Sequence, residues 1–160
     1  VAFNQDITEW QVKDTAKLTS DFNQKRLSID PITGQNFNLD VDGDGSVTAL
    51  GDGLMVIRKL FGAAFDGDVL TNKAISNSAT RTTTEIHEFI QSGIDEKVLD
   101  VDGDGSVTAL GDGLMVIRKL FGTAFAGAKL TDKAISNNAT RTTDEIHDYI
   151  AAMSDVGTSV

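Results

Sequence analysis

Aspartates recur at alternate positions in the stretch DVDGDG, which occurs at Asp40–Gly45 and again at Asp100–Gly105. The longer stretch LDVDGDGSVTALGDGLMVIRKLFG is repeated letter for letter at Leu39–Gly62 and Leu99–Gly122. Carboxylates at such close spacing repel one another unless a cation lies between them. The pattern therefore predicts two cation sites. The alternative is an acidic, glycine-rich turn exposed to water, and the identical repetition disfavours it.

Both acidic loops have the ligand spacing of an EF-hand loop, in which alternate residues of a tight turn face the ion. Aspartates occupy loop positions 1, 3 and 5, and glycine at position 6 allows the sharp turn. Serine at position 7 can offer its backbone carbonyl, and threonine at position 9 can ligate the ion. Glycine replaces the usual glutamate at position 12, and we expect the aspartate at position 13 to close the site. The predicted ligands are Asp40, Asp42, Asp44, Ser46, Thr48 and Asp52, and likewise Asp100, Asp102, Asp104, Ser106, Thr108 and Asp112.

The ligand set contains only oxygen atoms, without histidine or cysteine. Hard oxygen ligands favour Ca²⁺ over transition metals, and a flexible cage of six or seven of them suits Ca²⁺ better than Mg²⁺. We therefore expect two bound calcium ions.

A shift of sixty positions aligns 40–90 with 100–150 at 42 of 51 residues. This predicts one unit used twice, repeat 1 at 39–98 and repeat 2 at 99–158, with apolar faces packed on each other. Residues 1–38 lie outside the repeat and form an N-terminal extension.

The sequence of each repeat predicts a mainly α structure, in which a loop, a helix, a connection and a second helix follow in order. The first helix runs from about Asp52 to Phe61, has a wide apolar face and stops at Gly62. The second begins at Thr82, which forms a capping box with Glu85. Leu70–Ser76 is expected to make one short helical turn. No continuous helix is expected to enter the loop at Asp100.

The charge and composition exclude several classes of protein. The net charge of −10 disfavours nucleic acid and anionic membrane surfaces as partners. No apolar run approaches the roughly 18 residues that span a bilayer. Without cysteine, a bound metal can replace disulfides as the staple of a small module. We expect a monomeric piece of a longer protein, without a signal peptide of its own.

The duplicated stretch DVDGDGSV…D…LMVIRKLFG resembles the type I dockerin family of bacterial modules. The resemblance implies two calcium loop–helix repeats packed with pseudo-twofold symmetry, and a cohesin-like domain or another surface protein as partner. It implies the same aspartates and threonines as ligands. Paired loops of this kind join by a short strand contact, here between Val47 and Val107. The residues expected to face a partner are Ala49, Leu50, Arg58, Lys59, Ala109, Leu110, Arg118 and Lys119.

Three features depart from that family. The closing aspartate comes one residue late, the period of sixty is longer because a segment follows each helix, and Ala-Leu pairs replace the hydroxyl residues that meet cohesin. The first difference leaves the prediction of calcium binding intact, and the other two weaken the expectation of cohesin binding.

The N-terminal stretch AFNQDITEWQVKDTAKLTSDF is similar to short leucine-rich-type repeats of bacterial surface proteins. The similarity lies in Phe3, Asn4, Gln5, Asp6, Ile7 and Trp10. It implies an extracellular or cell-surface protein.

The remaining residues do not suggest catalysis. His87 and His147 are predicted at the boundary of an apolar stripe, Arg81 and Arg141 in ion pairs with nearby acids, and Met55 in the core. No phosphate loop and no nucleophile with a base was found, so we do not expect an enzyme. Three hypotheses stay open: a calcium-stabilised non-catalytic module, a dockerin-type docking module, and a calcium sensor that opens an apolar groove.

Overall fold

The computed structural model describes residues 37–156, which form helices and turns and contain no strand. Four α-helices follow in order: α2 at Leu54–Phe61, α3 at Thr83–Asp95, α4 at Leu114–Phe121 and α5 at Thr143–Ser154. The predicted mainly α class is therefore confirmed for this part of the chain. Residues 1–36 of the predicted N-terminal extension, which carry the surface-repeat resemblance, lie outside the described residues.

The helix that follows each acidic loop begins with a wide turn. Ala49–Gly53 and Ala109–Gly113 are π-helical and lead directly into α2 and α4. The predicted start near Asp52 falls inside this turn. As predicted, the helices end at Gly62 and Gly122, whose φ angles of 87° and 88° favour glycine.

The second helix of each repeat starts where the sequence predicts. Thr82 accepts a hydrogen bond from the Glu85 amide, and the Glu85 side chain accepts one from the Thr82 amide. Thr142 and Glu145 repeat this arrangement at α5. The capping box predicted at Thr82 is confirmed, and the second repeat has the same box.

The connections are built from short helical pieces. Two 3₁₀ turns, Ala63–Phe65 and Gly67–Val69, follow α2, and Gly122–Phe125 with Gly127–Lys129 follow α4. Within Leu70–Ser76, the amides of Ala74 and Ile75 donate to the Thr71 carbonyl. This is a hydrogen-bonded turn and not the predicted turn of helix, because Lys73 has a φ angle of 59°. As expected, α3 stops at Asp95, short of the second loop.

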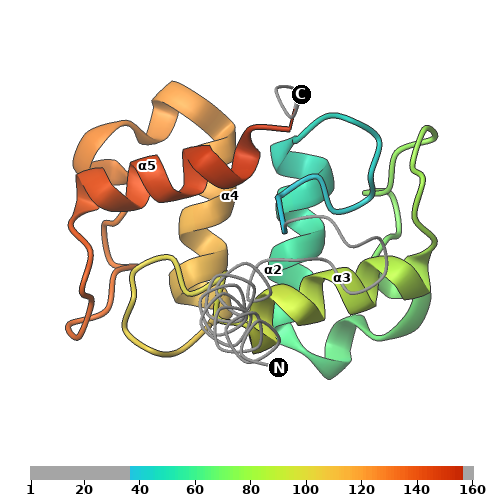
Figure 1. The fold of residues 1–160 in the computed structure, drawn as a ribbon, viewed down its shortest axis with the longest axis horizontal. Coiled ribbons are helices and arrows are strands. Elements are labelled where there is room, and N and C mark those ends of the chain that lie inside the picture. Colours follow the sequence, from blue (N-terminus) through green and yellow to red (C-terminus); the bar gives the residue numbers. More distant parts are fainter. Residues whose placement is uncertain (1–36, 157–160) are drawn as a thin grey trace, which may run out of the picture.

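Helices α2 and α4 lie side by side at the centre, with α3 and α5 on the outside (Figure 1). Their contact depends on two glycines. A Cβ atom on Gly53 would lie 3.2 Å from Ile117 and Leu120, and one on Gly113 would lie 3.0 Å from Ile57 and Leu60. A single buried apolar cluster contains residues from both repeats, including Met55 and Met115, so the core position predicted for Met55 is confirmed.

The predicted strand contact between Val47 and Val107 is wrong. Neither valine lies in a strand, and no backbone hydrogen bond joins them. Instead, both side chains are half-buried against the core, and the repeats meet through side chains of α2 and α4.

The residue before each acidic loop donates a backbone hydrogen bond to a carbonyl near the end of a helix. The Leu39 amide donates to the Met153 carbonyl at 2.8 Å, and the Leu99 amide donates to the Gly93 carbonyl at 3.0 Å. The donors are sixty residues apart, and so are the acceptors. Helix α5 therefore holds the entry to the first loop and α3 the entry to the second. No helix within 37–156 has the length and apolar character needed to cross a membrane.

Candidate metal centre

The acidic loops fold so that their carboxylates converge. Oxygen atoms of Asp40, Asp42 and Asp44 all lie within 4.8 Å of one another. In the second loop the same holds for Asp100, Asp102 and Asp112. Most of these side chains are shielded from water: Asp42 and Asp102 are only 2% exposed. Two clusters of acidic groups that could hold a metal ion are thus present.

Glycines and loop amides shape each cluster. Gly43 and Gly45 have φ angles of 74° and 91°, which let the chain turn tightly. The Asp44 and Gly45 amides then donate to the two carboxylate oxygens of Asp40 at 3.0 and 2.9 Å. In the second loop the Asp104 and Gly105 amides donate to Asp100 at 3.1 and 2.8 Å.

Asp52, the predicted closing ligand, joins the two ends of its loop. One oxygen accepts from the Val41 amide and the other from the Thr48 amide, each at 2.9 Å. Asp112 makes the equivalent bonds at 2.7 and 2.8 Å. The aspartate at position 13 therefore reaches back to the acidic cluster. In the second loop it belongs to the converging set, whereas in the first that set is completed by Asp44.

Burial makes these carboxylates costly to ionise. Desolvation raises the pKa of Asp52 to about 7 and that of Asp112 to about 6, and neighbouring aspartates add to both shifts. Desolvation also raises the pKa of Asp40 and of Asp102. A bound cation would remove much of this penalty.

Asp104 behaves differently, because the hydrogen bond from the Ser106 amide lowers its pKa. It does not belong to the converging set of the second loop. The predicted ligand Asp104 therefore differs from Asp102 and Asp112, whose pKa values are raised.

The hydroxyl-bearing residues predicted as ligands are engaged locally. The Thr48 hydroxyl accepts from the Gly51 amide at 3.1 Å and caps the π-helical turn, and Thr108 does the same at Gly111. Ser46 and Ser106 are exposed, and their amides donate to Asp44 and Asp104. Carbonyl ligation by the serines and ligation by the threonines stay predictions.

The segment between the helices also contacts the loop, which sequence reasoning missed. The Ser76 amide donates to a carboxylate oxygen of Asp42 at 2.8 Å. The Thr80 and Arg81 amides donate to the Asp42 carbonyl, and the Thr80 hydroxyl donates to the Gly43 carbonyl. Ser136, Thr140 and Arg141 repeat these bonds in the second loop. One signal was available: all three residues are the same in both copies.

The arginines expected in ion pairs contact the loop backbone, and the ion pairs themselves stay a prediction. Nη1 of Arg81 donates to the Asp40 and Val41 carbonyls at 2.9 and 3.2 Å. Nη1 of Arg141 donates to the Asp100 and Val101 carbonyls at 2.8 and 3.1 Å. The partners shown for both groups are therefore peptide carbonyls beside the acidic side chains.

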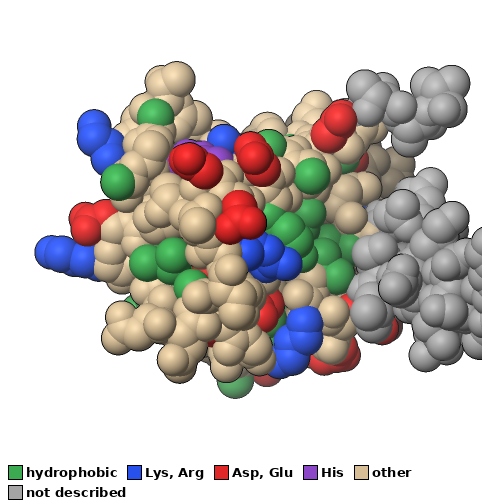
Figure 2. Space-filling model, turned by 60° about the vertical axis from the view of Figure 1, so that its left-hand side comes forward, with side chains coloured by type: hydrophobic (Ala, Val, Ile, Leu, Met, Phe, Trp, Pro, Cys, Tyr) green, Lys and Arg blue, Asp and Glu red, His purple; other side chains and the backbone are tan. Residues whose placement is uncertain are grey.

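The residues predicted to face a partner fall into two groups. Leu50 and Leu110 are 64% and 65% exposed, and Ala49 and Ala109 beside them are half-buried. By contrast, Arg58 donates to the Leu70 and Asn72 carbonyls, and Arg118 makes equivalent bonds. Figure 2 shows that hydrophobic side chains form small separate patches on the face in view.

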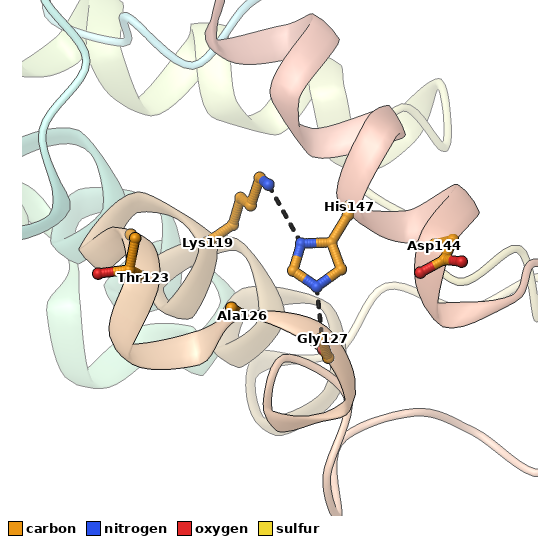
Figure 3. A pocket seen from close by; sticks show the side chains of 7 residues that line it. Lys119, Thr123, Ala126, Gly127, Asp144 and His147 are labelled. Carbon is orange, nitrogen blue, oxygen red and sulfur yellow. Dashed lines mark hydrogen bonds between the residues drawn. The ribbon is translucent and has the colours of Figure 1, made fainter.

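Lys59 and Lys119 are paired with the two histidines. The Lys119 amine lies 3.1 Å from His147 Nδ1, and Nε2 of that ring lies 3.0 Å from the Gly127 carbonyl (Figure 3). Lys59 and His87 repeat the pair at 3.3 Å. Both histidines are half-buried, as predicted for boundary residues. The adjoining cavity of about 440 Å³ is lined by residues such as Thr123 and Asp144 and contains none of the loop aspartates.

The chain was compared with models of protein families, with curated proteins and with solved structures, and none of them matches it.

Proposed function

We propose that this chain is a non-catalytic calcium-binding module that two Ca²⁺ ions fold and make rigid. One observation carries the proposal: in two identical loops, carboxylates that are largely buried converge to within 4.8 Å of one another. Such an arrangement is unfavourable unless a cation or protons neutralise it. The EF-hand-like arrangement of the two repeats, with pseudo-twofold symmetry, belongs to this proposal.

Calcium is the ion that best suits these loops. Carboxylate, carbonyl and hydroxyl oxygens are the only donors that the loops offer, and flexible oxygen cages are typical of Ca²⁺ sites. Two ions would change the formal charge of the chain from −10 to about −6. Because the closed loop and the ion stabilise each other, binding energy becomes folding energy. At a calcium concentration of 1,000 times Kd, mass action adds about 4 kcal/mol.

We place the module in a secreted or cell-surface protein, as part of a longer chain. Extracellular calcium is abundant enough to keep weak sites filled, since modules of that kind bind with Kd values of roughly 10⁻⁴ to 10⁻³ M. The surface-repeat resemblance of the N-terminal stretch supports the same location.

Titration of Ca²⁺ into metal-stripped protein tests the proposal, with calorimetry for stoichiometry and thermal melts for stability. We expect two bound ions and a large rise in Tm. Asp42→Asn and Asp102→Asn should each remove one ion. Asp66→Asn, which changes an exposed acid outside the loops, is the matched control and should leave both sites unchanged. No binding at millimolar calcium would overturn the proposal.

A dockerin-type docking module is the second candidate. The exposure of Leu50 and Leu110 favours it, because large apolar side chains at equivalent places beside both loops suit a protein partner. A calcium-dependent pull-down with a cohesin-like domain, repeated with the Leu50→Ser/Leu110→Ser double variant, tests it. Capture that requires both calcium and the leucines would support docking. A calcium sensor is less favoured, because Met55 and Met115 are fully buried in the core.

A further inference from the structure

We infer that Arg81 and Arg141 are positioning residues of the two calcium loops, each fixing the backbone of the first two loop residues so that the acidic side chains face the ion. The inference rests on the proposed calcium function and adds to it. It assigns part of the metal site to the segment between the helices, which lies outside both loops.

The hydrogen bonds define the role. The Arg81 guanidinium donates to the carbonyls of Asp40 and Val41, so it holds both peptide groups in place beside the Asp40 carboxylate. The Arg81 amide holds the Asp42 carbonyl as well. One residue therefore fixes three consecutive peptide groups at the point where the first two ligands leave the chain.

An aromatic ring fixes the guanidinium in turn. Arg81 lies over the Phe89 ring at 3.9 Å, and Phe89 stacks on Phe37 at 4.8 Å. In the second repeat Arg141 lies over the Tyr149 ring at 4.0 Å, and the Tyr149 hydroxyl donates to the Val98 carbonyl. A planar group that stacks and donates at once is a property of arginine that lysine lacks. Phe89 of α3 and Tyr149 of α5 thus contact the arginines that bind the loops.

The two copies offer an internal comparison. The loops are identical in sequence, so a difference in affinity between the sites must come from residues outside them. Arg81 is buried and Phe89 is 0% exposed, whereas Arg141 and Tyr149 are half-buried. Because a buried stack restricts the guanidinium more, we expect the first site to bind calcium more tightly than the second.

The test is a calcium titration of the whole chain followed by NMR, with Arg81→Lys and Arg141→Lys made separately. The Gly45 and Gly105 amides, which donate to Asp40 and Asp100, report the two loops separately. Each variant should weaken its own site about tenfold or more and change the other less than twofold. Arg118→Lys makes the same change at an arginine that donates to the Leu130 and Asp132 carbonyls, outside both loops, and is the control, which should leave the affinity of the second site within twofold.

The outcomes separate the inference from the function on which it rests. Wild-type protein that binds no calcium would overturn the proposed function. If the wild type binds two ions but the lysine variants bind normally, the arginines do not position the loops. Equal weakening of both sites by one variant would show a general loss of stability and would also overturn the inference. If Arg81→Lys fails to fold, the half-buried Arg141→Lys decides.

Discussion

At the scale of single residues, Asp52 shows how a carboxylate at loop position 13, one place later than in an EF-hand loop, can still join the two ends of its loop. Its two oxygens bind the Val41 and Thr48 amides, near the start and the end of the loop. The carboxylate is 3% exposed, and both amides compensate only part of the desolvation, so its pKa rises to about 7. In the metal-free protein this acid therefore holds a proton at pH values at which an exposed aspartate has lost it.

The raised pKa values predict how the stability of the metal-free protein depends on pH. Asp52 and Asp112 have pKa values of about 7 and 6 in the folded chain and near 3.8 when unfolded. Between these values the folded state binds more protons, so its stability is greatest near pH 4 and falls as the pH rises to 7. We expect the two groups together to lower the free energy of unfolding by several kcal/mol over this range, measured as a falling Tm of metal-stripped protein.

Calcium should reverse this trend, because the ion displaces those protons and binds more tightly as the pH rises. Asp52→Asn removes one titrating group and should flatten the slope of the metal-free curve. A metal-free Tm that rises steadily from pH 5 to pH 7.5 would contradict the prediction.

At the scale of elements, helix α3 shows how the repeats come to differ. Gly93 is buried, and a Cβ atom there would lie 2.6 Å from the Phe37 ring. The equivalent position in α5 is Met153, and position 97, equivalent to Phe37, is a lysine. The ring of Phe37 thus requires glycine in α3, whereas α5 accepts a long side chain.

Gly93→Ala should destabilise the protein although alanine favours helices. Overpacking against a stacked ring costs about 1 to 3 kcal/mol, and the helix propensity of alanine returns at most about 1 kcal/mol. Urea denaturation measures the net loss. In a Phe37→Ala background the ring is gone, so the same substitution should become neutral or stabilising. An equal loss in both backgrounds would show that Phe37 is not the cause.

At the scale of the whole molecule, each repeat completes the other. The core is a single cluster, α2 packs on α4, and the entry to each loop depends on the outer helix of the other repeat. Removal of one repeat would expose side chains such as Leu39 and Met55, which are now inaccessible to water.

The fragment 37–98 should therefore stay unfolded even with millimolar calcium, because about 60 residues without their partner bury too little apolar surface. Circular dichroism of the fragment and of the whole chain tests this. We expect one cooperative transition for the whole chain. A cooperative melt of the fragment alone would mean that the repeats are independent.

The sequence alone determined features that depend on neighbouring residues. Loop spacing predicted the converging aspartates, Thr82 with Glu85 predicted the start of α3, and Gly62 predicted the end of α2. These follow from local backbone geometry, which a few adjacent residues decide.

Only the tertiary structure decided which distant groups meet. It brought Ser76, Thr80 and Arg81 onto the first loop, across more than thirty positions of the chain. In place of the predicted contact between Val47 and Val107, the structure has α2 packed on α4. Such contacts depend on how whole faces fit together, and at Gly53 and Gly113 the absence of a side chain lets the helices approach closely.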